Sequence, residues 1–469
     1  MTNHTCDVAV IGAGTAGISA ERAARKAGAT TRLIDPRFDG TMCANRGCMP
    51  SKLLLAASHA AHAARDAETF GIRTGPVTID GPTVMERLRR YRDDFAASTR
   101  EVFDALPAGT CLKARARFTG PTTLELDSGD TVEARAVVIA TGSTPMIPPP
   151  LQGLGDLALT NATVFEQKDL PRSLAVIGGG AIGLEMAQGF ARLGVEVTLF
   201  DMARTLGGAR DPEVVTALHT AMAKEMTLHL GVSVEAERQG DAAHLTWTGD
   251  SSGSATFDRV LLATGRPPSL EGLNLQATGL ACDENGVPAF NPRTLQCGEA
   301  PIFIVGDANA DRAVLHEASE EGGLAGRNAV AFPAVTAVRR LPPFSITFTD
   351  PALVQIGEGP SDDWVCGTSR YEDQGRAKVE NRNTGVVRLF ATQGEGRLTG
   401  VEMFAPGAEH MAHFFMLAIL NGMSASALSE VPFYHPTLEE GLSGALGQIC
   451  SDTPMTTPGR WQTTPPPGG

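Results

Sequence analysis

Apolar and polar positions follow the same order in two separate parts of the chain. In the first part, an apolar run at 8–11 ends on a glycine, an alanine- and arginine-rich stretch follows over 16–28, and a second apolar run occupies 31–34. A short strand, a glycine turn, a helix and another strand in this order predict a parallel βαβ unit.

The second part repeats this order far along the chain. An apolar run at 173–177 leads into three glycines at 178–180, a helical pattern covers 184–193, and another apolar run covers 195–200. The repeat predicts two nucleotide-binding domains of the same kind rather than one domain with insertions.

Other apolar runs extend this α/β pattern. Those at 137–142 and 260–265 both end on Ala-Thr-Gly and are typical of buried strands, while a third at 302–305 runs into a Gly-Asp pair. The proline-rich segment 145–150 lies between the two halves and predicts a stiff linker.

The last third of the chain changes character. Short runs at 375–379, 386–391 and 398–404 predict strands joined by turns, and helical patterns lie near 407–421 and 437–449. We therefore expect an α+β domain after the two Rossmann-like, dinucleotide-binding α/β domains. The final residues, rich in Pro, Thr and Gly, are expected to form a flexible tail.

Composition narrows the classes of protein that fit this pattern. The 469 residues are 42% hydrophobic, and the formal net charge of −14 argues against a general polyphosphate-binding surface, so a nucleotide would need a dedicated pocket. Eight cysteines are too few for a disulfide scaffold, and no apolar stretch approaches the ~20 residues of a membrane span. With no basic segment ahead of a long apolar run, we expect a cytoplasmic protein without membrane or nucleic-acid partners.

The first glycine turn carries a dinucleotide-binding fingerprint, made by Gly12, Gly14 and Gly17 between the strand and the helix. Glycines allow the tight turn and the approach of the backbone to a pyrophosphate, and an acidic residue at the end of the next strand binds ribose hydroxyls. Asp35 stands at that position. Together these residues favour a bound dinucleotide over a purely structural glycine turn.

The second turn repeats the fingerprint with Gly178, Gly180 and Gly183, and Asp201 is its acidic residue. Two complete fingerprints predict two different dinucleotides, of which a flavin and a nicotinamide are the natural pair. A carboxylate favours the free 2′-hydroxyl of NAD, whereas Arg204 would suit the 2′-phosphate of NADP or simply face solvent. We expect NAD, with NADP as the alternative.

Cys43 and Cys48 are close neighbours in the chain. Residues five positions apart in a regular helix rise about 7.5 Å along its axis, so a bridge between them requires an interruption, which Gly47 would allow. Pro50 suits a first helical turn, so we expect a helix to start near Cys48 and to stabilise its thiolate. Two inert buried thiols or a metal site are the alternatives, although two thiols alone make no tetrahedral zinc site, and no metal is expected.

A second polar cluster contains His435, Thr437 and Glu440. Thr437 and Glu440 have the spacing of a capping box that opens a helix, whereas Glu440 could instead orient His435 as a general base. Spacing alone favours the helix cap, because a lone histidine in front of a helix is rarely catalytic.

In this order, the motifs resemble the flavin-dependent pyridine-nucleotide disulfide oxidoreductases, especially dihydrolipoamide dehydrogenases, from residue 6 to about 450. The matching segments are GAGTAG at 12–17, CANRGCMPSK at 43–52, ATGS at 140–143, GGGAIGLE at 178–185, ATGRP at 263–267, VGD at 305–307, FTDP at 348–351, GRA at 375–377 and HPTLEE at 435–440. The cysteine and His-Pro-Thr segments are the specific ones.

The resemblance implies two cofactor sites, each built on one fingerprint. The residues that would hold FAD are Gly12, Gly14, Gly17, Asp35, Lys52, Thr141, Gly142 and Asp307. The residues that would hold the nicotinamide nucleotide are Gly178, Gly180, Gly183, Asp201 and Gly265.

The resemblance also implies a redox centre that two subunits share. Cys48 would make the charge-transfer contact with the flavin, and Cys43 would exchange with the substrate. Lys52, paired with Glu185, would lie near the reactive nitrogen of the flavin. His435 and Glu440 would act from the partner subunit of a homodimer that the C-terminal domain builds, which reverses the preference for a simple helix cap.

Some positions near the cysteines bear on the substrate. Pro-Ser-Lys after Cys48 is similar to dihydrolipoamide dehydrogenases rather than glutathione reductases, and the tail lacks the paired cysteines of mercuric reductases. Where the family usually has Gly-Gly-Thr before the first cysteine, this chain has Gly-Thr-Met at 40–42, a change that would remove one polar contact to the flavin. Arg46 replaces an aliphatic residue, where it would lower a thiol pKa or face solvent.

We therefore expect an FAD enzyme that oxidises a dithiol, such as dihydrolipoamide or a lipoyl domain, and reduces NAD. The alternatives are an NAD(P)H-dependent reductase of a small disulfide or a metal ion, and a flavoprotein without enzymatic activity. The expected parts are an FAD-binding part at 1–147, an NAD(P)-binding part at 148–266, a central FAD-binding part at 267–340, a dimerisation domain at 341–452 and a tail at 453–469.

Overall fold

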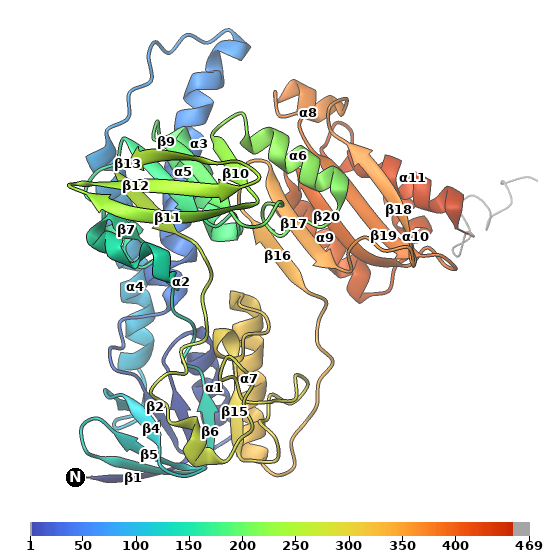
Figure 1. Cartoon of the computed structure of the whole chain (residues 1–469). Coiled ribbons are helices and arrows are strands. Elements are labelled where there is room, and N and C mark those ends of the chain that lie inside the picture. Colours follow the sequence, from blue (N-terminus) through green and yellow to red (C-terminus); the bar gives the residue numbers. More distant parts are fainter. Residues whose placement is uncertain (1, 454–469) are drawn as a thin grey trace, which may run out of the picture.

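The computed structural model describes residues 2–453, which form three parts built around sheets (Figure 1). The part at the bottom of Figure 1 holds the N-terminal strands, the part at the upper left holds the middle of the chain, and the part on the right holds the C-terminal strands and helices. The predicted fold class, two α/β units followed by an α+β unit, is confirmed.

The first part is a seven-stranded sheet of order β3-β2-β1-β6-β5-β4, in which β15 also pairs with β6. Its strands are β1 (Asn3–Ile11), β2 (Thr31–Ile34), β3 (Cys111–Leu112), β4 (Ala116–Phe118), β5 (Thr123–Leu126), β6 (Thr131–Ile139) and β15 (Ile302–Ile304). Because β15 runs parallel to β6, a late segment of the chain returns to the sheet that begins at the N-terminus. Helices α1 (Thr15–Lys26) and α7 (Leu315–Ala331) pack against each other and against this sheet.

Close packing explains the glycines of the two fingerprint turns. Gly12 has a φ of +105°, and a Cβ on it would lie 2.3 Å from the carbonyl oxygen of Ala140. A Cβ on Gly17 would lie 1.8 Å from the carbonyl oxygen of Gly12. Gly178 and Gly183 repeat this geometry in the second turn. Any side chain at these positions would force strand and helix apart.

The second part is a parallel five-stranded sheet of order β10-β9-β8-β14-β7. Its elements are β7 (Ala158–Leu159), β8 (Ser173–Ile177), β9 (Glu196–Asp201), β10 (Thr227–Leu230) and β14 (Arg259–Leu262), with helices α5 (Ala181–Arg192) and α6 (Pro212–Met222). An antiparallel sheet not predicted from the sequence precedes β14 and consists of β11 (Val232–Gln239), β12 (Ala242–Gly249) and β13 (Gly253–Phe257).

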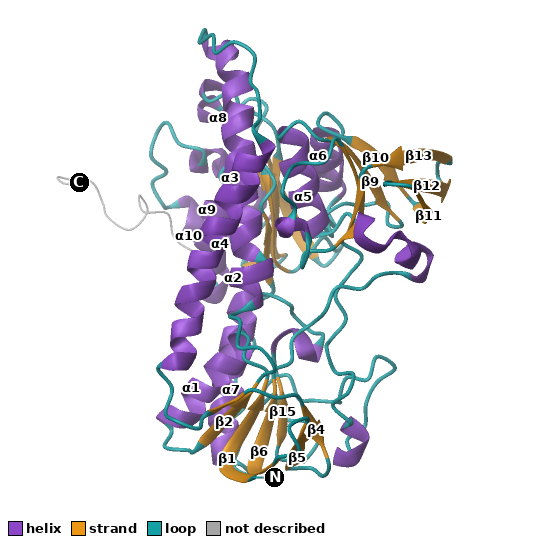
Figure 2. Ribbon diagram, turned by 90° about the vertical axis from the view of Figure 1, so that its left-hand side faces the viewer, coloured by secondary structure: helices purple, strands orange, loops and turns teal. Residues whose placement is uncertain are grey.

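Two long helices connect the first two parts. The segment after β2 forms α2 (Met42–Arg46), α3 (Cys48–Asp66) and α4 (Gly81–Asp104). Figure 2 shows α3 and α4 running along the long side of the molecule, and α3 packs on both α4 and α5. Leu54 and Met85 share one buried apolar core with Phe190, so the cysteine-bearing helix is fixed against the second sheet.

The C-terminal part is an antiparallel sheet of order β16-β17-β20-β19-β18. Its elements are β16 (Phe344–Thr347), β17 (Ala352–Gly357), β18 (Trp364–Arg370), β19 (Val386–Thr392), β20 (Leu398–Ala405), α8 (Gly375–Val379), α9 (Ala408–Leu420), α10 (Ala425–Ser429) and α11 (Leu442–Asp452). Helix α9 packs on β17 and β20, and α11 packs on β18 and β19.

Two expectations for this part are wrong in detail. Residues 375–379 form a short helix rather than a strand, because the Gln374 side chain caps it at Ala377 and an Arg376–Glu380 ion pair spans one helical turn. The helix expected from 437 begins only at Leu442, after a 3₁₀ turn.

The remaining regular elements of the described residues are 3₁₀ helices, which lie at Ala67–Phe70, Pro149–Leu157, Val164–Glu166, Leu275–Thr278, Gly306–Asn309 and Glu439–Gly441. Apart from Thr453, the expected flexible tail lies outside the described residues. Across residues 2–453, none of the helices combines the length and the apolar character needed to cross a lipid bilayer.

Candidate active site

The two cysteines lie at a break between two helices. Thr41 caps α2 with its hydroxyl oxygen, which accepts a hydrogen bond from the Ala44 backbone N–H at 3.3 Å. The helix ends at Gly47, whose φ of −133° and ψ of −117° are not helical, and α3 begins at Cys48. The expected interruption and helix start are thus confirmed, and Cys43 and Cys48, on either side of the break, influence each other's pKa.

The two thiols are chemically unequal. A hydrogen bond from Cys43 and, against partial desolvation, the Lys52 cation lower the pKa of Cys48 to about 6. The same hydrogen bond raises the pKa of Cys43 above the ordinary thiol value. The opposite directions of the two pKa shifts favour Cys48 as the thiolate of the pair and Cys43 as the neutral thiol.

Lys52 is held by residues from the other two parts of the chain. Its Nζ lies 2.7 Å from Glu185 Oε2 and 4.2 Å from the centroid of the Phe348 ring. The second carboxylate oxygen of Glu185 accepts a hydrogen bond from the Phe348 backbone N–H at 2.9 Å. This clamp fixes the ammonium group one helical turn after Cys48, where it stabilises negative charge.

The N-terminus of α1 is open to a ligand. Its cap residue Gly14 has no side chain, and no protein atom lies within 4 Å of the place its Cβ would take. At the end of β2, Asp35 Oδ2 accepts a hydrogen bond from the Ala13 N–H at 3.0 Å. The Thr141 hydroxyl is buried without a hydrogen-bond partner. A backbone cradle, a fixed carboxylate and an orphaned hydroxyl fit a dinucleotide such as FAD.

Residues after β6 and β15 complete this region. Asp307 Oδ2 accepts a hydrogen bond from the Ser143 hydroxyl at 2.6 Å, and Ser143 in turn accepts one from the Arg266 guanidinium at 3.1 Å. Gly142 has a φ of +70° and no protein atom within 4 Å of its absent Cβ. The predicted residues Thr141, Gly142 and Asp307 therefore lie together beyond the C-terminal ends of β6 and β15, two neighbouring strands of the first sheet.

The second glycine turn has the same construction. The Gly179 N–H donates to Asp201 Oδ2, and the Ala203 N–H donates to Asp201 Oδ1 at 2.7 Å. The cap of α5, Gly180, offers no side chain, and space around the absent Cβ of Gly265 is open. These residues fit a second dinucleotide at the end of β9.

His435 and Glu440 form a pair on the surface of the C-terminal part. His435 Nδ1 lies 2.8 Å from Glu440 Oε2, and the histidine side chain is 82% exposed. The Glu440 N–H donates to the Thr437 hydroxyl, so half of the predicted capping box forms, while the carboxylate binds His435 instead of the helix end. Within residues 2–453, no hydrogen bond or ion pair joins His435 to either cysteine.

Comparisons with known proteins show the family of this chain. The family model of pyridine nucleotide-disulphide oxidoreductases matches residues 6–322, and the model of their dimerisation domain matches residues 345–446. The chain belongs to the pyridine nucleotide-disulphide oxidoreductase family. It is therefore an enzyme of the FAD-dependent disulfide oxidoreductases, which use a nicotinamide cofactor, and its dimerisation domain supports a homodimer.

Relatives of this oxidoreductase have different substrates in their names. A dihydrolipoyl dehydrogenase of Chlamydia muridarum is 28% identical, with 97% of this chain and 99% of that protein aligned. A mercuric reductase of Acidithiobacillus ferrooxidans is 31% identical, with 95% and 83% aligned. The Cu(II) complex of the HOCl-induced flavoprotein disulfide reductase RclA from Escherichia coli shares the fold, with a TM-score of 0.82 at 20% identity over 95% of this chain and 99% of that one.

Several contacts in the oxidoreductase could not be derived from the sequence. Phe348 stands in a motif that matches the family, but only the structure places its ring over Lys52. The guanidinium of Arg46, a side chain that is 33% exposed, lies 3.4 Å from an Asp39 carboxylate oxygen, a partner that the sequence did not indicate. Among residues 2–453, no cluster of three or more His, Cys, Asp or Glu side chains is arranged to hold a metal ion.

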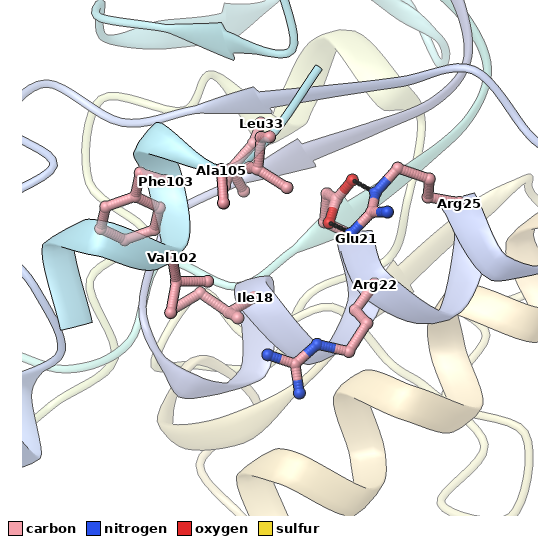
Figure 3. Close-up of a pocket in the computed structure, with 9 residues that line it drawn as sticks. Ile18, Glu21, Arg22, Arg25, Leu33, Val102, Phe103 and Ala105 are labelled. Atoms are coloured by element: carbon pink, nitrogen blue, oxygen red, sulfur yellow. Dashed lines mark hydrogen bonds and ion pairs between the residues drawn. The ribbon is translucent and has the colours of Figure 1, made fainter. Parts of the chain in front are cut away.

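A pocket of about 260 Å³ lies on the first part of the chain (Figure 3). It is lined by Ile18, Glu21, Arg22, Arg25, Leu33, Val102, Phe103, Ala105 and Leu106. Glu21 is paired with Arg25 at 2.8 Å and with the Thr31 hydroxyl, so its buried charge is satisfied within the fold. None of the predicted cofactor or catalytic residues lines this pocket.

Proposed function

We propose that this oxidoreductase oxidises a dithiol of the dihydrolipoamide kind and reduces NAD, with Cys43 and Cys48 as its redox pair. The inequality of the two thiols supports the proposal most, since a thiolate beside Lys52 and a neutral thiol suit two different tasks. The dihydrolipoyl dehydrogenase relative, which aligns over nearly its whole length, supports the substrate class.

The proposal assigns the cofactors to the two fingerprint turns. Residues 1–147 and 267–340 would bind FAD, residues 148–266 would bind the nicotinamide nucleotide, and residues 341–452 would form the dimer. When bound, FAD supplies the electron relay between the thiol pair and the nicotinamide. Gly12, Gly14 and Gly17 would admit the pyrophosphate of FAD to the end of α1. Asp35 would accept hydrogen bonds from its ribose.

The other assigned residues divide by cofactor. Those proposed to contact FAD are Lys52, Thr141, Gly142 and Asp307, and those proposed to contact NAD are Gly178, Gly180, Gly183, Asp201 and Gly265. Glu185 is proposed to position Lys52.

The thiol chemistry follows from the roles of the two sulfurs. In the oxidised enzyme a substrate thiolate attacks Cys43 Sγ, the Cys43–Cys48 bond breaks, and Cys48 leaves as the thiolate. The second substrate thiolate then attacks the sulfur of the first in the mixed disulfide and releases the oxidised substrate and Cys43 as a thiolate, which takes up one of the two protons given up by the dithiol. Lys52 stabilises the Cys48 thiolate in this state. Overall, the dithiol and NAD⁺ yield the disulfide, NADH and one proton.

The pair of His435 and Glu440 is proposed to manage the protons. A carboxylate on Nδ1 holds the neutral ring with its proton at Nδ1 and leaves Nε2 free to accept one. Because the ring is exposed and has no bond to its own cysteines, we propose that His435 of the partner subunit accepts the substrate proton.

The mercuric reductase relative, at a similar identity, favours a second candidate, an NAD(P)H-dependent reductase of a metal ion or small disulfide. One paired steady-state assay separates the two functions. The proposal predicts turnover with dihydrolipoamide and NAD that greatly exceeds turnover of mercuric ion or glutathione disulfide with NADPH. The reverse ranking would overturn the proposal and favour the second candidate. Activity that survives in Cys43→Ser would show that the thiol pair is not the redox centre.

A further inference from the structure

Asp250 places a second carboxylate beside the end of β9, close to Asp201, the acidic residue of the second fingerprint. Arg204 follows Asp201 by three positions and would be the cation nearest a 2′-phosphate. Its guanidinium is occupied, with Nε 2.5 Å and Nη2 2.7 Å from the two carboxylate oxygens of Asp250. This bidentate geometry uses the same fork of donors that would bind a phosphate.

The backbone around the pair supports this orientation. Asp250 follows β12, whose end pairs with the start of β11. The Gly231 N–H donates to the Ala203 carbonyl oxygen at 3.2 Å, which ties this edge to the loop that carries Arg204. A Cβ on Gly231 would lie 2.4 Å from Asp250 Oδ2, so only glycine leaves room for the carboxylate here. The ion pair is exposed, with 77% of the Arg204 side chain and 46% of the Asp250 side chain open to solvent, and these backbone contacts fix where it lies.

We propose that Asp250 is a specificity-determining residue, which holds Arg204 in an ion pair and thereby keeps the 2′ position of the nicotinamide nucleotide unfavourable to phosphate. This inference rests on the proposed use of NAD. Asp250 neutralises the only cation within three residues after Asp201, and it adds a second negative charge to the same edge. A 2′-phosphate dianion at this edge would meet the carboxylates of Asp201 and Asp250, with the Arg204 cation already paired.

The test uses purified holoenzyme and two kinds of measurement. Asp250→Asn keeps the size of the side chain but removes its charge, so Arg204 becomes free to bind phosphate. We expect the ratio of kcat/KM for NADP to that for NAD to rise about five- to tenfold. Calorimetry should show a similar gain in affinity for adenosine 2′,5′-bisphosphate, with no gain for 5′-AMP.

Two further variants identify the cause. Arg204→Gln in the Asp250→Asn background should abolish the gain, because the freed guanidinium is its source. Asp156→Asn removes the carboxylate of another exposed ion pair in the same part of the chain, with Arg238 near the far end of β11, and should leave the ratio unchanged.

Each contrary outcome has one meaning. If the wild type already prefers NADP, the proposed use of NAD is wrong. If the wild type prefers NAD but Asp250→Asn changes neither the ratio nor the bisphosphate affinity, Asp250 does not set specificity. If the gain persists without Arg204, repulsion by Asp250 alone is responsible and the proposed role of the ion pair is refuted.

Discussion

Removing the hydrogen-bond donor of Cys43 should change the acidity of Cys48. The largest influence that lowers the pKa of Cys48 to about 6 is the hydrogen bond from Cys43, and Lys52 contributes less. In Cys43→Ala the donor is lost while Lys52 remains. The pKa of Cys48 should then rise toward the ordinary thiol value, to about 8. In Cys43→Ser a hydroxyl still donates, so the pKa should stay near that of the wild type.

The consequence is a change in the pH range of thiol reactivity. Since the thiolate is the nucleophile, alkylation of Cys48 falls as the pH drops through its pKa. At pH 7 the thiolate fraction would decrease from about 90% to about 10% in Cys43→Ala. A more basic thiolate is also more nucleophilic, so the midpoint of the pH–rate profile is the proper readout, not the rate at one pH.

The assay is alkylation of the reduced enzyme with iodoacetamide between pH 5 and pH 9, followed by mass spectrometry of the Cys48 peptide. Other cysteines interfere little near pH 6, because burial raises the pKa values of Cys6, Cys111, Cys282, Cys297 and Cys366. The predicted midpoints are about 6 for Cys43→Ser and about 8 for Cys43→Ala. Equal midpoints in the two variants would refute the hydrogen bond as the cause of the low pKa.

Three further predictions concern the cofactors and the lysine clamp. Gly14→Val should leave a folded protein without flavin, because the protein has room for the side chain but it would fill the place of the pyrophosphate; stoichiometric flavin by absorbance would contradict this. Phe348→Leu should raise the midpoint of Cys48 alkylation by about 0.5 to 1 pH unit, because Lys52 loses its contact with the ring. Phe348→Tyr keeps the ring and should leave the midpoint unchanged. An unchanged midpoint in the leucine variant would show that the ring does not help to hold Lys52. Asp201→Ala should reduce the preference for NAD over NADP in steady-state kinetics by about tenfold, and an unaltered preference would remove Asp201 from specificity.

The regular parts of the fold could be predicted because their apolar patterns are short and bounded by glycine. The strands at 8–11, 31–34 and 173–177 and the helices that follow the two glycine turns lie close to their expected places. Residues 375–379 could not be assigned correctly, since five residues are too few to reveal a helical period. The antiparallel sheet of β11, β12 and β13 depends on pairing within the insertion, which the fingerprint pattern does not contain.

The site could be predicted as a set of residues but not as a set of contacts. The spacing around Gly47 was sufficient to predict a break in the helix, because regular helical geometry excludes contact between the two thiols. The clamp on Lys52 joins three distant segments, so no local pattern indicates it. The spacing of Thr437 and Glu440 favours a cap, and only the observed bond to His435 shows where the carboxylate goes. Tertiary contacts decide between such readings of one motif.

We propose that each active site combines Cys43 and Cys48 of one subunit with His435 of the partner subunit. The direct measurement is the dihydrolipoamide-dependent rate of NAD reduction by purified heterodimers of Cys48→Ser and His435→Gln subunits. Each variant homodimer should be nearly inactive. The heterodimer has one site with both lesions and one with neither, and lesions within one site are not additive, so it should recover about half of the wild-type rate per dimer. Inactive heterodimers, in an exchange that wild-type dimers survive, would contradict a shared site.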